Sequence, residues 1–81
     1  MTTPVILIPQ VKDPDRTVRT LYAMSLELDV VPRIGEYFAL HNTVYEVHMV
    51  KHVLNPEDLA VKFIITEKVE GPCIEVYLRR I

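Results

Sequence analysis

The segment at residues 43–54 reads TVYEVHMVKHVL, and this stretch decides the fold class of the chain. It is rich in β-branched residues, which is typical of a β-strand. The apolar residues suited to a core occupy odd positions up to Val47 but even positions from Val50 onward. A regular strand alternates its faces, so it cannot bury both sets on one side. The pattern therefore predicts one extra residue, a β-bulge, at His48 and Met49.

A second long strand is predicted at residues 59–66, after a polar turn at residues 55–58. If Val50 lies opposite Phe63, the bulge lies opposite Ile64. A bulge bends and twists its strand, as the closure of a small barrel requires. The sequence thus predicts a long, bent and bulged hairpin.

Period-2 alternation and turn residues divide the rest of the chain into further short strands. These are predicted at residues 5–8, 17–28, 36–40 and 73–78. A helix is the main alternative for residues 17–28, because Leu, Met, Ala and Glu favour helices. On a helix, however, the apolar residues would spread around the axis instead of forming one stripe. We therefore expect a single all-β domain over residues 1–81, with five to six strands and a barrel over about residues 17–78.

Composition narrows the function classes. The chain has 81 residues, of which 49% are hydrophobic and 25% charged, as in folded soluble domains. Nine basic residues face eleven acidic ones, and this balance argues against a dedicated nucleic-acid binder. No apolar run approaches the ~20 residues of a membrane helix, and residues 5–8 lack the features of a secretory signal. The single cysteine, Cys73, fits a packed strand residue in a reducing compartment, so we predict a cytoplasmic protein.

Two short motifs carry a resemblance. PRIGE at residues 32–36 fits P-x-x-G-[DE], and YEVHMV at residues 45–50 fits Y-x-V-x-x-V. Together they resemble small SH3-like β-barrel proteins of phages and bacteria, most of them uncharacterised. The resemblance implies a fold and not an activity, because small barrels host many functions. It assigns Gly35 a turn role, and it allows a phage-borne factor that acts on a host protein.

The chain offers little chemistry for catalysis or metal binding. On a strand, His48 and His52 lie about 13 Å apart, too far for one ion with bonds of about 2 Å. Ser25 is the only serine and has no His–acid pattern near it, and Gly35 and Gly71 are too few for a phosphate-binding loop. We therefore predict no enzyme, no metal and no cofactor.

Protein binding or self-association is the leading functional prediction. It rests on apolar residues of the predicted outer face, which would form an interface patch. These residues are Leu21, Met49, Ile64 and Tyr77. Nucleic-acid binding is the alternative, and a small-ligand or nucleotide-binding oligomer is another. The basic residues for a polar or nucleic-acid contact are Arg19, Lys51, Lys62 and Arg79, with Lys51 expected opposite Lys62.

Overall fold

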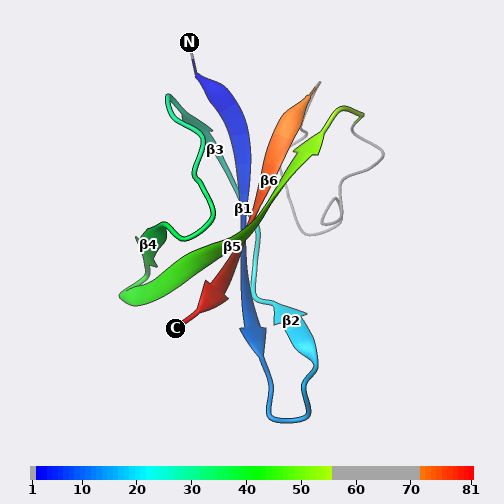
Figure 1. The fold of residues 1–81 in the computed structure, drawn as a ribbon, viewed down its shortest axis with the longest axis vertical. Helices are drawn as coiled ribbons and strands as arrows, with labels where there is room; N and C mark the ends of the chain where they lie inside the picture. The colour runs from blue at the N-terminus through cyan, green and yellow to red at the C-terminus, as the bar shows by residue number, and fades with distance from the viewer. Residues whose placement is uncertain (1, 56–71) are drawn as a thin grey trace.

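The computed structural model describes residues 2–55 and 72–81, which form an all-β structure (Figure 1). In chain order the strands are β1 (Thr3–Lys12), β2 (Val18–Thr20), β3 (Met24–Leu28), β4 (Tyr37–Leu40), β5 (Thr43–Val53) and β6 (Cys73–Arg80). The predicted all-β class is confirmed. Among the described segments none is a helix long and apolar enough to span a bilayer.

The strands belong to one six-stranded sheet in the order β2-β1-β6-β5-β4, with β3 also paired to β1. β1 and β6 run parallel at its centre, and the other ladders are antiparallel. No ladder joins β3 to β4 within residues 2–55 and 72–81. The sheet is therefore open between these two strands, and the closed barrel stays a prediction.

The prediction of a single strand at residues 17–28 is wrong, because this segment forms two strands, β2 and β3. Both strands pair with the same edge of β1, β3 with Thr3–Leu7 and β2 with Gln10–Lys12. The chain changes partner beside Pro9, whose carbonyl accepts a hydrogen bond from the Leu21 amide at 2.9 Å. β1 also continues beyond the predicted residues 5–8 in both directions, since these partners extend it.

The bulge lies where the sequence predicts it. In the ladder between β5 and β6, Val47 is opposite Leu78 and Met49 is opposite Tyr77, so His48 is the extra residue. The ladder that contains the bulge is made with β6. The partner strand predicted at residues 59–66 lies outside the described residues.

The turns before and after β4 also follow the sequence. His41 and Asn42 join β4 to β5 with φ values of 49° and 62°, as a two-residue hairpin turn with two positive φ angles requires. Gly35 has a φ of 94°, and its amide donates to the Val47 carbonyl at 2.9 Å. The predicted turn role of Gly35 is confirmed.

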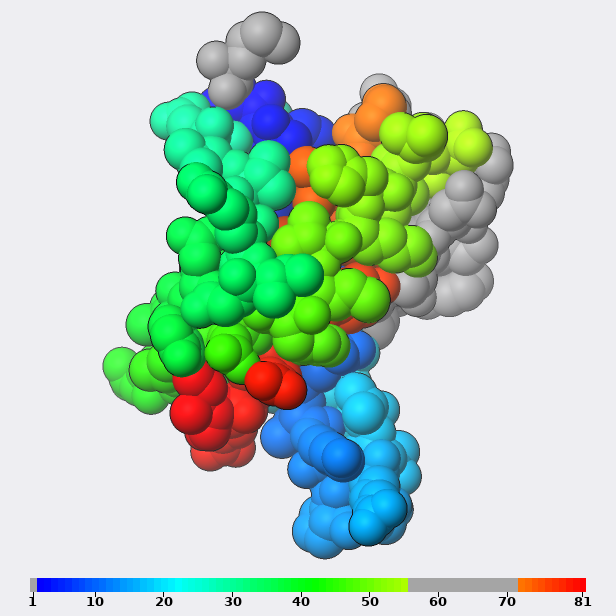
Figure 2. Space-filling view, viewed as in Figure 1, coloured from blue at the N-terminus to red at the C-terminus, as the bar shows by residue number. Residues whose placement is uncertain are grey.

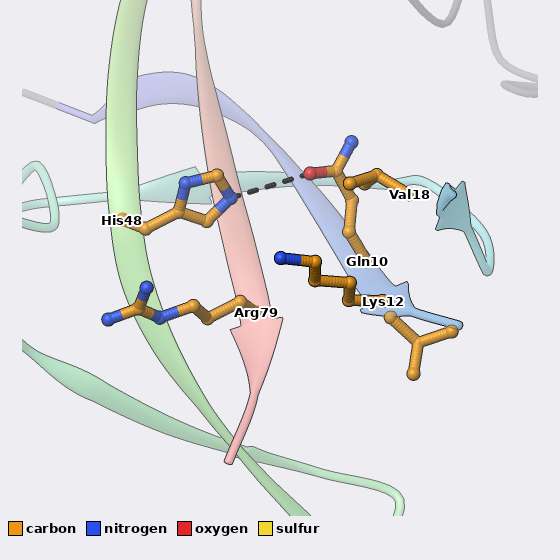
Figure 3. A pocket seen from close by; sticks show the side chains of 6 residues that line it. Gln10, Lys12, Val18, His48 and Arg79 are labelled. Atoms are coloured by element: carbon orange, nitrogen blue, oxygen red, sulfur yellow. Dashed lines mark hydrogen bonds between the residues drawn. The ribbon is translucent and has the colours of Figure 1, made fainter. Parts of the chain in front are cut away.

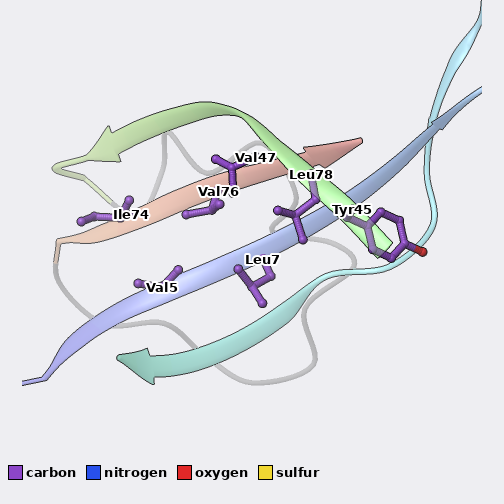
Figure 4. Packing of buried hydrophobic residues seen from close by; sticks show 7 residues of the cluster. All are labelled: Val5, Leu7, Tyr45, Val47, Ile74, Val76 and Leu78. Carbon is purple, nitrogen blue, oxygen red and sulfur yellow. The ribbon is translucent and has the colours of Figure 1, made fainter. Parts of the chain in front are cut away.

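Buried side chains form one cluster on each face of the central strands. The first contains Val5, Leu7, Tyr45, Val47, Ile74, Val76 and Leu78 (Figure 4). The second contains Ile6, Ile8, Val53, Cys73 and Tyr77. Both faces of β1 and β6 are therefore buried, as is usual for parallel strands at the centre of a sheet. The predicted exposure of Tyr77 is wrong: the side chain faces away from the first cluster, but only 7% of it is accessible.

Candidate interaction surface

An ion pair joins β5 to β6 near one end of the sheet. Glu46 lies opposite both Tyr37 of β4 and Arg79 of β6, so these three side chains share one face. The Arg79 Nε and Nη2 atoms donate to the same Glu46 carboxylate oxygen at 3.0 and 2.6 Å. Charge-assisted bonds of this kind are shorter and stronger than neutral ones, although the Arg79 side chain remains 65% exposed.

Large apolar side chains surround this ion pair. Tyr37 is 63% exposed, Val44 48% and Ile81 71%. Val44 lies two residues before Glu46 and Ile81 two residues after Arg79, and the Ile81 amide donates to the Val44 carbonyl at 3.3 Å. The three residues therefore form one patch on three neighbouring chain segments, here named the apolar end patch. Figure 2 shows the end of β6, in red, exposed beside the green residues of β4 and β5.

The apolar end patch borders the open edge of the sheet at β4. The four residues of β4 read YFAL and contain no charge and no proline. Proteins usually place charged residues or proline in an edge strand, because these prevent it from pairing with another chain. In an antiparallel pair, every second residue of a strand forms hydrogen bonds with the partner strand. Glu36 is one of the residues that bond to β5, because its carbonyl accepts a hydrogen bond from the Val47 amide at 2.8 Å. The N–H and C=O groups of Tyr37 and Ala39 therefore point away from β5, toward the open edge.

A second feature lies between the β1–β2 hairpin and the end of β6. It is a hollow of about 220 Å³, here named the His48 hollow (Figure 3). It is lined by Gln10, Val11, Lys12, Val18, His48 and Arg79. The His48 Nε2 lies 3.4 Å from the Gln10 Oε1, and the Gln10 Nε2 donates to the Thr20 Oγ1 at 3.3 Å. These contacts hold the imidazole at the mouth of the hairpin.

The face of β6 opposite the first cluster contains a buried carboxylate, Glu75, with no accessible surface. The Tyr77 hydroxyl donates to it at 3.2 Å, and the Lys51 ammonium lies 3.5 Å away. Burial, and then the charge of Glu75, raises the pKa of Tyr77 to about 12. The same two causes, in the same order, raise the pKa of the Cys73 thiol. These shifts keep both acids protonated, so this cluster is suited to stability and not to nucleophilic chemistry.

Only two of the four predicted interface residues are exposed in the described part of the structure. Leu21 and Met49 are 40% and 41% exposed, Tyr77 is buried, and Ile64 lies outside the described residues. The sequence analysis does not identify the apolar end patch. The alternation of Val44 and Glu46 with the buried Tyr45 and Val47 nevertheless indicates an exposed face of β5.

The basic residues predicted for a polar or nucleic-acid contact do not converge. Arg19 pairs with Asp13 at 3.5 Å, Lys51 with Glu75 and Arg79 with Glu46. Lys51 lies directly opposite Glu75 in the ladder, and Lys62, its expected neighbour, is outside the described residues. Each described member of the set thus has a carboxylate beside it.

The described residues contain no group of three or more His, Cys, Asp or Glu side chains placed to hold a metal ion. His41 lies in the turn after β4 and contacts Tyr22 edge-on, with ring centroids 5.6 Å apart.

No family model, no curated protein and no solved structure matches this chain.

Proposed function

We propose that this chain is a non-enzymatic interaction module that self-associates through the edge of β4 and the apolar end patch. The observation that carries the proposal is an edge strand without charge or proline, bordered by three exposed apolar side chains. An edge of this kind is a template for the addition of another strand. A cytoplasmic location suits the single thiol of Cys73.

A two-fold contact between two copies satisfies the outward groups of β4 most simply. The strand of one copy would run antiparallel to that of the other, with Phe38 opposite the partner subunit's Phe38. Tyr37 would then exchange hydrogen bonds with the partner subunit's Ala39, using the N–H and C=O groups that point away from β5. A two-fold axis doubles every favourable contact, and the apolar end patches of both copies would lie next to the new ladder.

Replacement of Ala39 tests this contact without disturbing the ladder between β4 and β5. Ala39 is exposed, and its N–H faces the open edge, so Ala39→Pro removes one outward donor and Ala39→Lys places a charge at the contact. Val30→Lys is the matched control, because Val30 is 70% exposed but lies in the loop before β4. All three variants should retain the β-type circular dichroism spectrum.

Sedimentation equilibrium should give a dimer for the wild type and for Val30→Lys, and a monomer for both Ala39 variants. A wild type that stays monomeric at high protein concentration contradicts self-association. Dimers in all variants contradict the β4 contact. The same edge would also accept an extended strand of a different protein, and a monomeric wild type would turn the search toward such a partner.

A further inference from the structure

The His48 hollow is lined by nitrogen-bearing side chains from three strands. Lys12 comes from β1, His48 from β5 and Arg79 from β6. Figure 3 shows the Lys12 side chain directed toward the space between His48 and Arg79. The strands position these groups through the sheet itself, because Gln10 lies opposite Arg79 in the parallel ladder and Lys12 follows two residues later on the same face.

The charges at the hollow are unevenly balanced. The Arg79 guanidinium has five N–H groups, and its contacts with Glu46 involve only Nε and Nη2. Donors of Arg79 therefore remain for a second acceptor. Lys12 is exposed, and no carboxylate of the described residues forms an ion pair with it. Two full positive charges at the hollow thus face one carboxylate, that of Glu46.

The size of the hollow limits what it can hold. Its volume of about 220 Å³ lies below the roughly 300–1,000 Å³ of pockets for drug-sized ligands. A second hollow of about 290 Å³ adjoins it across His48 and Arg79, and Ile34, Gly35 and Glu46 contribute to its wall. The first hollow therefore suits a compact anionic group, and the second gives room for the polar remainder of a small molecule.

We propose that the His48 hollow binds the phosphate group of a small phosphorylated molecule. Lys12 supplies an ammonium, which is a common phosphate ligand, and Arg79 supplies the donors that Glu46 leaves over. The His48 ring lies beside them, at the wall that the two hollows share. The Gln10 side chain holds the ring through the Nε2 contact at 3.4 Å. Val11 and Val18 close the apolar side of the hollow.

A titration with inorganic phosphate, followed by two-dimensional amide NMR at constant ionic strength, tests this site. The amide signals of Gln10, Lys12, His48 and Arg79 should shift and saturate, while acetate at the same concentrations should leave them in place. Lys12→Gln should weaken phosphate binding about tenfold, since a hydrogen bond to a charged group is lost. Arg16→Gln is the matched control: it removes the same charge from the same hairpin, outside the lining of the hollow, and should change binding less than about twofold.

Shifts that do not saturate, or that acetate reproduces, would overturn the phosphate site. An equal loss of binding in Lys12→Gln and Arg16→Gln would also overturn it, because the effect would then be one of net charge. Both substituted residues are exposed and lie away from β4. The spectra of the variants should therefore remain those of a folded chain, and the result does not depend on whether the chain self-associates.

Discussion

Tyr77 should make the stability of the fold depend on alkaline pH. Its pKa is raised from the ordinary value of 10.0 to about 12, by burial and by the Glu75 carboxylate. The folded state therefore resists ionisation of the phenol, while the unfolded chain ionises normally. The resulting contribution to the free energy of unfolding is fully present below about pH 10 and is lost as the pH rises toward 12. At pH 11 the loss is about 1.4 kcal/mol, since a tenfold difference in ionisation then separates the two states.

Urea unfolding of the wild type and Tyr77→Phe, followed by circular dichroism, measures this effect. Near pH 8 the variant should be about 1–3 kcal/mol less stable, because the 3.2 Å hydrogen bond to Glu75 is lost. At pH 11 that difference should shrink by about 1.4 kcal/mol, since Phe cannot ionise. Tyr37→Phe is the control, because Tyr37 is 63% exposed, and its difference from the wild type should stay constant. A Tyr77→Phe difference that is also constant from pH 8 to 11 would refute the reasoning.

Three further predictions concern the sheet. Leu78→Ala should lower the free energy of unfolding, measured by urea titration, by about 2.7–5 kcal/mol, because Leu78 is fully buried. The control Leu54→Ala, at a 73% exposed site, should lower it by less than about 0.5 kcal/mol. Similar losses in the two variants would show that Leu78 is not in the core. Deletion of His48 should leave the pairs of β5 with β6 in register and give a folded chain in amide NMR, but deletion of Lys51 should reverse the faces of the strand beside it and unfold the protein. The Cys73 thiol, whose pKa is raised chiefly by burial, should react with an aromatic disulfide reagent slowly when folded and rapidly in urea; equal rates would show that it is accessible.

Local patterns in the sequence were enough to predict the bulge and the approximate positions of most described strands, although residues 17–28 form two strands instead of one. The parity change between Val47 and Val50 requires an extra residue whichever strand lies opposite, and so the bulge is found at His48 in a ladder with β6. The turn at His41 and Asn42 follows from residue chemistry alone. A few neighbouring residues determine the bulge and the turn, so both can be predicted before the rest of the fold is known.

Pairing between distant strands could not be predicted in the same way. Glu75 stands between Ile74 and Val76, so alternation assigns it to a solvent face, yet it is buried because the central strand is covered on both sides. The exposure of Tyr77 was mispredicted for the same reason. The His48 hollow depends on the parallel ladder that sets Gln10 beside Arg79. The partner of a parallel strand has no local signature in the sequence, because the two strands are joined only by a long connection.

The parallel ladder at the centre of the sheet also orders the events of biosynthesis. Val5 pairs with Ile74 and Pro9 with Leu78, so the second strand of the central pair leaves the ribosome after every other described strand. Until then β1 has only its partners β2 and β3, and β5 has only the short β4 among the described strands. Contacts so distant in sequence form slowly. Until β6 emerges, the nascent chain would therefore expose apolar strand edges, and such edges are what chaperones shield from aggregation.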